Sequence, residues 1–240
     1  MVVLVPSDIE SMFTLTVHAF NIAERLRTPV FLLSSKDMVL SMHTLDRDRL
    51  VLPEVVNRVR HTSDRPFVPY QVDEAPDIPD FLPIGADKRV RFTTSMHDEN
   101  AYLTKAPDRI ERKLVHLDEK ITKHADEIES VKADLEDGAE SLLAAFGVNA
   151  EMCREVVQRV RQGGGKCSLL VLESLFPIPE RAIAEALRGV KRMILPEMNL
   201  GLYAGAIEHL IPPGIELVSV PKIDGDLLTV EEVIHKGGLL

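Results

Sequence analysis

Cysteine is scarce in this sequence of 240 residues. Only Cys153 and Cys167 are present, and they form no CxxC pair. An iron–sulfur cluster or a zinc ion held by four cysteines of this chain alone is therefore excluded, because such sites need four ligands. We expect both side chains to be small, buried, apolar groups. The sparse use of cysteine also suits a reducing cytoplasm.

Basic residues are the minority among the charges. Lys and Arg total 28 against 38 Asp and Glu, which gives a formal net charge of -10 at pH 7. Proteins that bind nucleic acid or anionic lipid through a general surface need an excess of positive charge. We therefore expect no nucleic-acid partner and no membrane partner for this chain.

Long apolar runs are also missing. No stretch approaches the ~20 consecutive apolar residues that a membrane-spanning helix needs. Residues 1–6 lack the basic lead and the long apolar core of a signal peptide. The sequence therefore predicts a cytoplasmic protein.

Glycine-rich phosphate loops are absent as well. Gly163–Gly165 follows an expected helix and precedes an expected strand, whereas phosphate loops follow a strand and open a helix. Phe146–Asn149 stands at a strand-to-helix turn, but it lacks the further glycines of a dinucleotide fingerprint. We interpret both as turns. No nucleophile elbow, Cys/His pair or suitably spaced carboxylate dyad is present, so the residues alone predict no catalytic group and no metal site.

The first 45 residues carry a β-α-β pattern. Val2–Val5 is a continuous apolar run, as in a buried parallel strand, and Val30–Leu33 is a second one. Between them, Ser7 and Glu10 have capping-box spacing at the start of a helix that runs to about Arg27. The side chains expected to pack from this helix are Ile9, Phe13, Val17, Phe20 and Ile22.

This β-α-β unit is too small to bury a core of its own. The chain begins inside the first expected strand, so we expect the unit to complete a larger sheet. The missing strands would come from another polypeptide or from a longer form of this chain.

Residues 46–136 combine a proline-rich segment with a pattern typical of a long helix, unlike the β-α-β unit before them. Six prolines fall between Pro53 and Pro83, which predicts an extended connector with a short helix at 46–51 or at 54–59. Pro107 then suits the first turn of a long amphipathic helix, packed on a neighbour. About 28 helical residues would span ~42 Å. The apolar spacing alternates between three and four over Ile110, Leu114, Leu117, Ile121, His124, Ile128, Val131 and Leu135.

Residues 137–240 alternate between strand and helix. Such alternation predicts an α/β domain with a parallel sheet and helices on both faces. The expected strands are Ser141–Phe146, Cys167–Leu172, Arg192–Leu195 and Glu216–Val220. The expected helices are Ala150–Gln162, Pro179–Leu187, Leu202–Leu210 and Thr229–His235.

Two polar groups are candidate site residues. His97, Asp98 and Glu99 form the densest polar cluster and are candidates for an active-site or interface loop. The alternative is a hydrogen-bonded loop anchor, because adjacent residues of an extended chain point to opposite faces. Glu197 and Asn199 follow an expected strand, at the end of an open sheet where ligands bind, and are candidates for an interface or pocket. The alternative for Asn199 is a helix cap.

Several segments resemble motifs of one enzyme family. They occur in the family's order and cover nearly the whole chain. The motifs are Arg27–Ser34 (RTPVFLLS), Ser95–Glu99 (SMHDE), Leu175–Glu180 (LFPIPE), Pro196–Gly201 (PEMNLG) and the ending with Lys222, Gly225 and Thr229–Glu232 (TVEE). Together they resemble the alpha subunits of 2-oxoacid:ferredoxin oxidoreductases. Among the subgroups of this family, the sequence resembles the 2-oxoglutarate type most.

The resemblance implies a division into three parts. Residues 1–45 would be the end of a thiamine pyrimidine-binding domain, 46–136 the Pro-rich connector and long helix, and 137–240 a transketolase C-terminal-like domain. The family's thiamine-activating glutamate and its YPITPS segment are expected outside this chain, so no catalytic residue carries over. The sequence departs from the family at Ala101, Val148 and Leu202, where glycine, serine and glutamine are usual.

The resemblance also implies an activity and partners. The complex would oxidatively decarboxylate a 2-oxoacid to its acyl-CoA and pass electrons to ferredoxin, while the isolated chain would be inactive. Thiamine diphosphate with Mg²⁺ and iron–sulfur would belong mainly to a beta subunit, and this chain alone would bind none of them. A gamma subunit and a chain with the missing pyrimidine domain are further candidate partners, beside ferredoxin and coenzyme A. The alternatives are a transketolase or E1 beta-like subunit and a non-catalytic assembly module.

Overall fold

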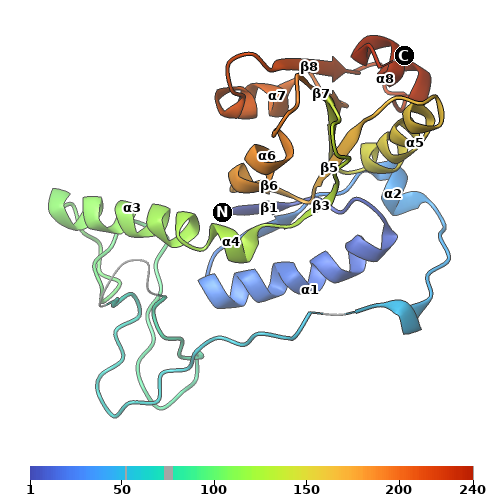
Figure 1. The fold of residues 1–240 in the computed structure, drawn as a ribbon. Coiled ribbons are helices and arrows are strands. Elements are labelled where there is room, and N and C mark those ends of the chain that lie inside the picture. The colour runs from blue at the N-terminus through green and yellow to red at the C-terminus, as the bar shows by residue number, and fades with distance from the viewer. Residues whose placement is uncertain (52, 73–77, 240) are drawn as a thin grey trace.

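The computed structural model describes residues 1–51, 53–72 and 78–239 (Figure 1). Its strands are β1 (Val2–Leu4), β2 (Val30–Leu32), β3 (Val131–Asp134), β4 (Ser141–Ala145), β5 (Ser168–Leu172), β6 (Ser174–Phe176), β7 (Arg192–Glu197) and β8 (Glu216–Pro221). Its α-helices are α1 (Ile9–Leu26), α2 (Lys36–Leu40), α3 (Pro107–Thr122), α4 (Ala125–Ile128), α5 (Asn149–Gln162), α6 (Glu180–Ala186), α7 (Leu202–Ile207) and α8 (Val230–Gly237). Two 3-10 helices are η1 (Arg47–Arg49) and η2 (Glu208–Leu210).

The C-terminal part is built on a five-stranded sheet in the order β3-β5-β4-β7-β8. β4 pairs in parallel with β5 and β7, β7 pairs in parallel with β8, and only β3 runs antiparallel. Alternate residues of β4 point to opposite faces, as a strand requires. Leu143 packs under α5 and α8, while Leu142 packs under α6 and α7. The α/β prediction for this region is therefore confirmed.

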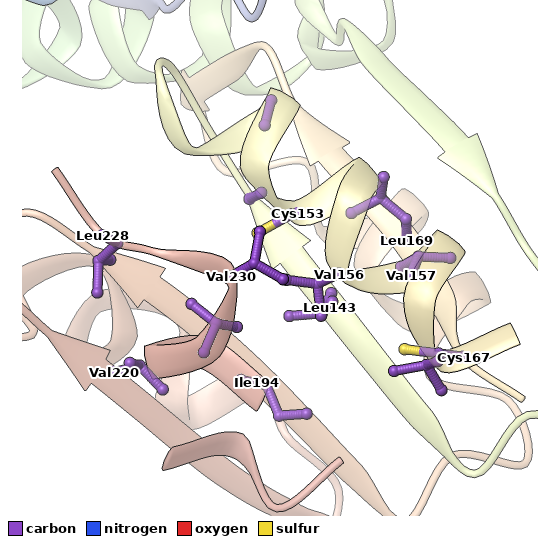
Figure 2. Packing of buried hydrophobic residues seen from close by; sticks show 14 of the residues in the cluster. Leu143, Cys153, Val156, Val157, Cys167, Leu169, Ile194, Val220, Leu228 and Val230 are labelled. Carbon is purple, nitrogen blue, oxygen red and sulfur yellow. The ribbon is translucent and has the colours of Figure 1, made fainter. Parts of the chain in front are cut away.

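Figure 2 shows the packing on one face of this sheet, where α5 and α8 cover β4 and β7. Leu143 and Ile194 of the strands meet Val156 of α5 and Val230 of α8. The two cysteines lie in the same apolar cluster, are free and are buried, as predicted. Burial raises the pKa of the Cys167 thiol to about 11, so it stays protonated at neutral pH.

The N-terminal part forms a separate three-stranded sheet in the order β2-β1-β6. β1 pairs in parallel with β2 and antiparallel with β6, which comes from the C-terminal half of the chain. The small β-α-β unit therefore gains one strand from within this chain. α1 covers the sheet, and its Leu15, Ile22 and Leu26 join Ile121 and Ile128 in one core.

A buried polar cluster links these two sheets. The Glu173 carboxylate, between β5 and β6, accepts hydrogen bonds from Ser7 Oγ at 2.6 Å and Ser130 Oγ at 3.1 Å. Lys132 Nζ lies 2.9 Å from Glu173 and 2.8 Å from Asp8. Burial opposes the charge on Lys132, but these two carboxylates outweigh it and raise the pKa of the ammonium. The cluster therefore fixes the start of α1 against β3.

Three expectations for the N-terminal unit were wrong. The helix cap is Asp8, whose side chain accepts the N–H of Ser11 in a capping box, while Ser7 bonds to Glu173 instead. Phe13 and Phe20 do not pack inward, and Phe20 is 68% exposed. Phe31 of β2 is 48% exposed, because it points to the face opposite Val30 and Leu32, which pack against the core under α1.

The connector is extended, as predicted. Among its described residues, 46–106 contain η1 and two isolated bridges, Arg60 with Phe81 and His97 with Leu103. Of the two alternative short helices, the first is present as η1 and the second is not, since residues 54–59 form no helix. The short helix α2 has no counterpart among the predicted elements.

The single long helix predicted from Pro107 was wrong. α3 begins at Pro107 as expected, but it ends at Thr122 after 16 residues, or about 24 Å. His124 Nδ1 lies 2.8 Å from Lys120 O at the break, α4 follows, and Val131 begins β3. Because β3 pairs with β5, sheet formation overrides a periodicity that fits a helix equally well.

A candidate cleft between the connector and α3

The His97–Glu99 loop is a tight turn held by Asp98. The Asp98 N–H donates to Tyr102 O at 2.8 Å, and Asp98 Oδ1 accepts the N–H groups of Asn100 and Tyr102, both at 3.0 Å. Ala101 has φ of 66°, in the left-handed region that favours glycine. This is the position at which the resemblance noted in the sequence implies a glycine.

The turn faces a cleft of about 490 Å³ between the connector and α3, which we call the histidine cleft. His97, Asp98 and Glu99 all line it, so the turn brings together three side chains that an extended strand would separate. Across the cleft, Arg109 Nη1 lies 3.3 Å from Asp98 Oδ2 and 3.9 Å from Glu99 Oε2. Asp98 is thus both a loop anchor and an ion-pair partner of α3.

Tyr70 lines the histidine cleft beside His97. Its ring lies 4.0 Å from the His97 ring, measured between centroids, and Lys113 Nζ lies 4.2 Å from its centroid. His97 Nδ1 lies 2.5 Å from Ser95 O, while Nε2 is buried and has no hydrogen-bond partner among the described residues. The cleft therefore combines an aromatic ring with cationic and anionic side chains, which suits binding of a polar group. Besides His97 and Tyr70, its charged lining residues are Asp98, Glu99, Arg109, Glu111, Arg112 and Lys113.

Glu197 and Asn199 lie elsewhere, at the end of β7. The fully buried Glu197 carboxylate accepts the N–H of Tyr203 at 2.9 Å and of Ala204 at 3.1 Å. Asn199 Oδ1 accepts the N–H of Leu202 at 2.8 Å. Both side chains therefore cap the start of α7, and neither lines the histidine cleft. Burial and the nearby Glu197 charge raise the pKa of Tyr203.

A cationic group at the end of α1 was missed by the sequence analysis. Arg27, in a left-handed conformation with φ of 46°, donates to the carbonyls of Pro69, Pro79 and Asp80 at 3.2, 2.9 and 3.1 Å. Lys120 is only 5% exposed, and its Nζ donates to Arg27 O at 3.3 Å. Burial, followed by the charges of Arg27 and Lys113, lowers the pKa of Lys120 to about 8.

The only sequence signal for this group is Arg27 in the RTPV motif, which the sequence analysis used solely as a mark of resemblance. The sequence around Lys120 carries no signal of its burial, because that burial depends on how α3 meets the end of α1.

Metal-binding side chains are scattered over the described ranges. No group of three or more His, Cys, Asp or Glu side chains there is arranged to hold a metal ion. The two cysteines are buried in an apolar core with raised pKa values, so they do not fit an iron–sulfur cluster. Over the same ranges, no helix is long and apolar enough to cross a membrane.

The chain is similar in sequence to one family model and to subunits of known oxidoreductases. Residues 139–233 match the family described as pyruvate:ferredoxin oxidoreductase core domain II. The chain is 30% identical to the 2-oxoglutarate synthase subunit KorA of Methanothermobacter marburgensis, over 98% of this chain and 62% of that protein. It is 28% identical to the ketoisovalerate oxidoreductase subunit VorB of Methanothermobacter thermautotrophicus, over 98% of this chain and 58% of that protein.

A solved structure shares the fold. It is the 2-oxoglutarate:ferredoxin oxidoreductase from Magnetococcus marinus, with a TM-score of 0.85 and 20% identity, over 98% of this chain and 41% of that chain. This chain therefore has the mixed α/β fold of that enzyme. It spans less than two thirds of the length of the curated relatives it matches.

Proposed function

We propose that this chain, which is related over nearly its whole length to subunits of 2-oxoacid:ferredoxin oxidoreductases, is the C-terminal part of an alpha-type subunit of such an enzyme. The single observation that supports this most strongly is the 98% coverage of the chain in its alignment with a 2-oxoglutarate synthase subunit. Motifs in all three parts of the sequence follow the family's order, so the similarity is not confined to the matched C-terminal domain.

The proposed reaction is the oxidative decarboxylation of a 2-oxoacid to an acyl-CoA, with electrons passed to ferredoxin. When bound, thiamine diphosphate would supply the carbon–carbon cleavage and iron–sulfur would carry the electrons. The described residues offer no donor set for Mg²⁺ or a cluster, so we assign these groups to a beta subunit. This chain is then not catalytic alone.

Within that complex, the chain's own residues would position and cover the shared active site and would not take part in the reaction. The His97–Glu99 turn lies on the connector, at the surface of this chain, and we assign it to an interface or to the edge of the shared active site. Glu197 and Asn199 fix the start of α7 at the carboxyl end of the parallel sheet. Residues 1–45, 46–136 and 137–240 would be the end of the pyrimidine-binding domain, the connector and the transketolase C-terminal-like domain.

The test is an activity assay on the complex purified through this chain from its own cell. We expect reduction of a viologen dye or ferredoxin that requires both a 2-oxoacid and coenzyme A, and no such activity from the 240-residue chain alone. Activity from the isolated chain would contradict the non-catalytic role. Lipoamide-linked or ketol-transfer turnover without dye reduction would favour the transketolase or E1 beta-like alternative. A complex without activity of either kind would favour an assembly module.

A further inference from the structure

An apolar groove of about 630 Å³ lies where α3 and α4 meet the amino terminus and the segment after β6. Figure 1 shows the end of α3 beside the N-terminus and β6. The apolar wall of the groove includes Leu117, Ile121, Phe176, Pro177, Ile178 and Pro179. We call it the acidic groove, because it is also lined by the carboxylates of Asp118, Asp126, Glu129 and Glu180.

Large side chains of the apolar wall are exposed. Phe176 is 47% exposed and Leu117 is 41% exposed. Leu114, one helical turn before Leu117, is 49% exposed and extends the same apolar stripe along α3. The sequence predicts that this stripe packs on a neighbour. Over the described residues, Ile121 of the stripe joins the core beneath α1, while Leu114 and Leu117 join none of the apolar clusters. Exposed apolar surface of this kind marks a contact with another protein.

The charges around the acidic groove are mostly negative. Among the described residues, Arg181 is its only basic side chain, and it already lies 3.4 Å from Asp126 and 3.3 Å from Glu129. Asp118 and Glu180 form no ion pair over the same ranges. The groove therefore combines an apolar wall with two carboxylates that lack a cationic partner.

The residues outside the described ranges do not supply the missing cations. Positions 52, 73–77 and 240 hold no Lys, Arg or His. The amino group of Met1 adds one positive charge at the groove, but the four carboxylates still outnumber the cations. A ligand that covers the apolar wall therefore gains from positive charge at its edges.

We propose that the acidic groove and the exposed stripe of α3 bind an amphipathic helix of a partner protein, with lysine or arginine beside its apolar face. This proposal does not rest on the proposed enzymatic role. A helix satisfies its own backbone hydrogen bonds, whereas Pro177 and Pro179 have no N–H to pair with an added strand. The partner's apolar residues would cover Phe176, and its basic residues would pair with Asp118 and Glu180.

Isothermal titration calorimetry of the 240-residue chain with two synthetic peptides tests this proposal. The first peptide has about 15 residues of Leu and Lys, with the leucines at helical spacing. The second has the same composition in an order that forms no apolar stripe. We expect the first to bind at least about tenfold more tightly, because both carry the same charge but only the first covers the apolar wall.

The matched variants are Asp118→Lys in the groove and Asp64→Lys on the connector, which change the net charge equally. Both positions are exposed, and lysine suits the end of a helix, so both chains should fold. We expect Asp118→Lys to weaken binding of the first peptide by about tenfold, and Asp64→Lys to weaken it by less than about twofold.

Methionine methyl groups give a readout that does not depend on the variants. Met1 lines the acidic groove, whereas Met42 is 100% exposed and lies outside it. In ¹³C-methyl NMR spectra, the first peptide should shift the signal of Met1 and leave that of Met42 unchanged. No binding, equal binding of the two peptides, equal losses in the two variants or an unchanged Met1 signal would overturn the proposal. A homodimer of the chain that the peptide dissociates would also overturn it, since the groove would then belong to a second copy.

Discussion

The C-terminal sheet and the connector are stabilised by different kinds of contact. The sheet buries apolar residues on both faces, beneath α5 and α8 on one side and α6 and α7 on the other. The connector is held mainly where side chains of α1 reach its backbone, as Asn21 does at Glu54 and Val56, and Arg27 does at three carbonyls. The sheet therefore provides rigidity, while the histidine cleft forms where polar contacts hold the chain.

The largest expected effect is the loss of stability when a leucine of the sheet is truncated, compared with a leucine of the connector. Leu143→Ala removes a fully buried side chain between β4 and α5, and we expect a loss of about 3 kcal/mol in the free energy of unfolding. Leu103→Ala removes a connector side chain that is 73% exposed. This variant should change the free energy of unfolding by less than about 0.5 kcal/mol. Urea denaturation measures both. Equal losses would show that the two regions are stabilised alike.

Arg27→Ala should loosen the connector without unfolding the sheet. Loss of three charge-assisted hydrogen bonds to Pro69, Pro79 and Asp80 should cost about 2 kcal/mol locally. We expect faster amide hydrogen exchange at residues 68–72 and 78–82, with β4 and β5 unchanged. Arg25→Ala is the control, since the ion pair that Arg25 forms among the described residues is an exposed one, with Glu127 at 3.8 Å. Unchanged exchange in the connector would contradict this role of Arg27.

The buried ammonium of Lys120 should make stability depend on pH. Its pKa in the folded chain is about 8, against 10.5 for the ordinary lysine, so the unfolded state binds the proton more tightly. The contribution of Lys120 to the free energy of unfolding is therefore lowest below pH 8, and it rises as the pH increases from 8 towards 10.5. Lys120→Met should remove that rise and stabilise the chain at pH 7.

The control for that titration is Lys123→Met, which removes an exposed lysine paired with Glu119 on the same helix. Its urea midpoints should follow the wild type in their pH dependence. Parallel pH profiles for the Lys120→Met variant and the wild type would show that Lys120 is not titrating in the folded chain near pH 8.

The smallest expected effect concerns Ala101. A residue with a side chain is strained at its φ of 66°, so Ala101→Gly should stabilise the chain by about 0.5–1 kcal/mol. Ala86→Gly, at a connector position without positive φ, should instead destabilise it slightly. Urea denaturation of the two variants gives the comparison. Destabilisation by both would mean that the lost methyl contact of Ala101 outweighs its backbone strain.

The same contrast explains what the sequence could predict. The four strands and four helices expected after Gly138 are present, because each buries a face whose period is visible in the sequence. The helix break near His124 was not predictable, since the apolar period continues into β3 and only pairing with β5 makes that segment a strand. Phe20 could not be placed by its hydrophobicity, because the periodic pattern does not say which face has a neighbour in this chain.

The candidate site was predictable only in part. His97, Asp98 and Glu99 were found by their density, and the turn does bring them to one cleft. Arg27 and Lys120 were missed as a site, because they are more than ninety positions apart and meet only when α3 packs on α1. Glu197 was found by its place after a strand, but its capping of α7 depends on the turn at Gly201.

Native mass spectrometry of the complex purified through this chain from its own cell, with thiamine and iron assayed, tests the central claim most directly. We predict an assembly larger than the chain's 26.8 kDa that carries thiamine diphosphate and iron–sulfur, with a partner mass that accounts for the beta subunit. A lone chain, or a homo-oligomer without either cofactor, would contradict membership in a 2-oxoacid:ferredoxin oxidoreductase complex.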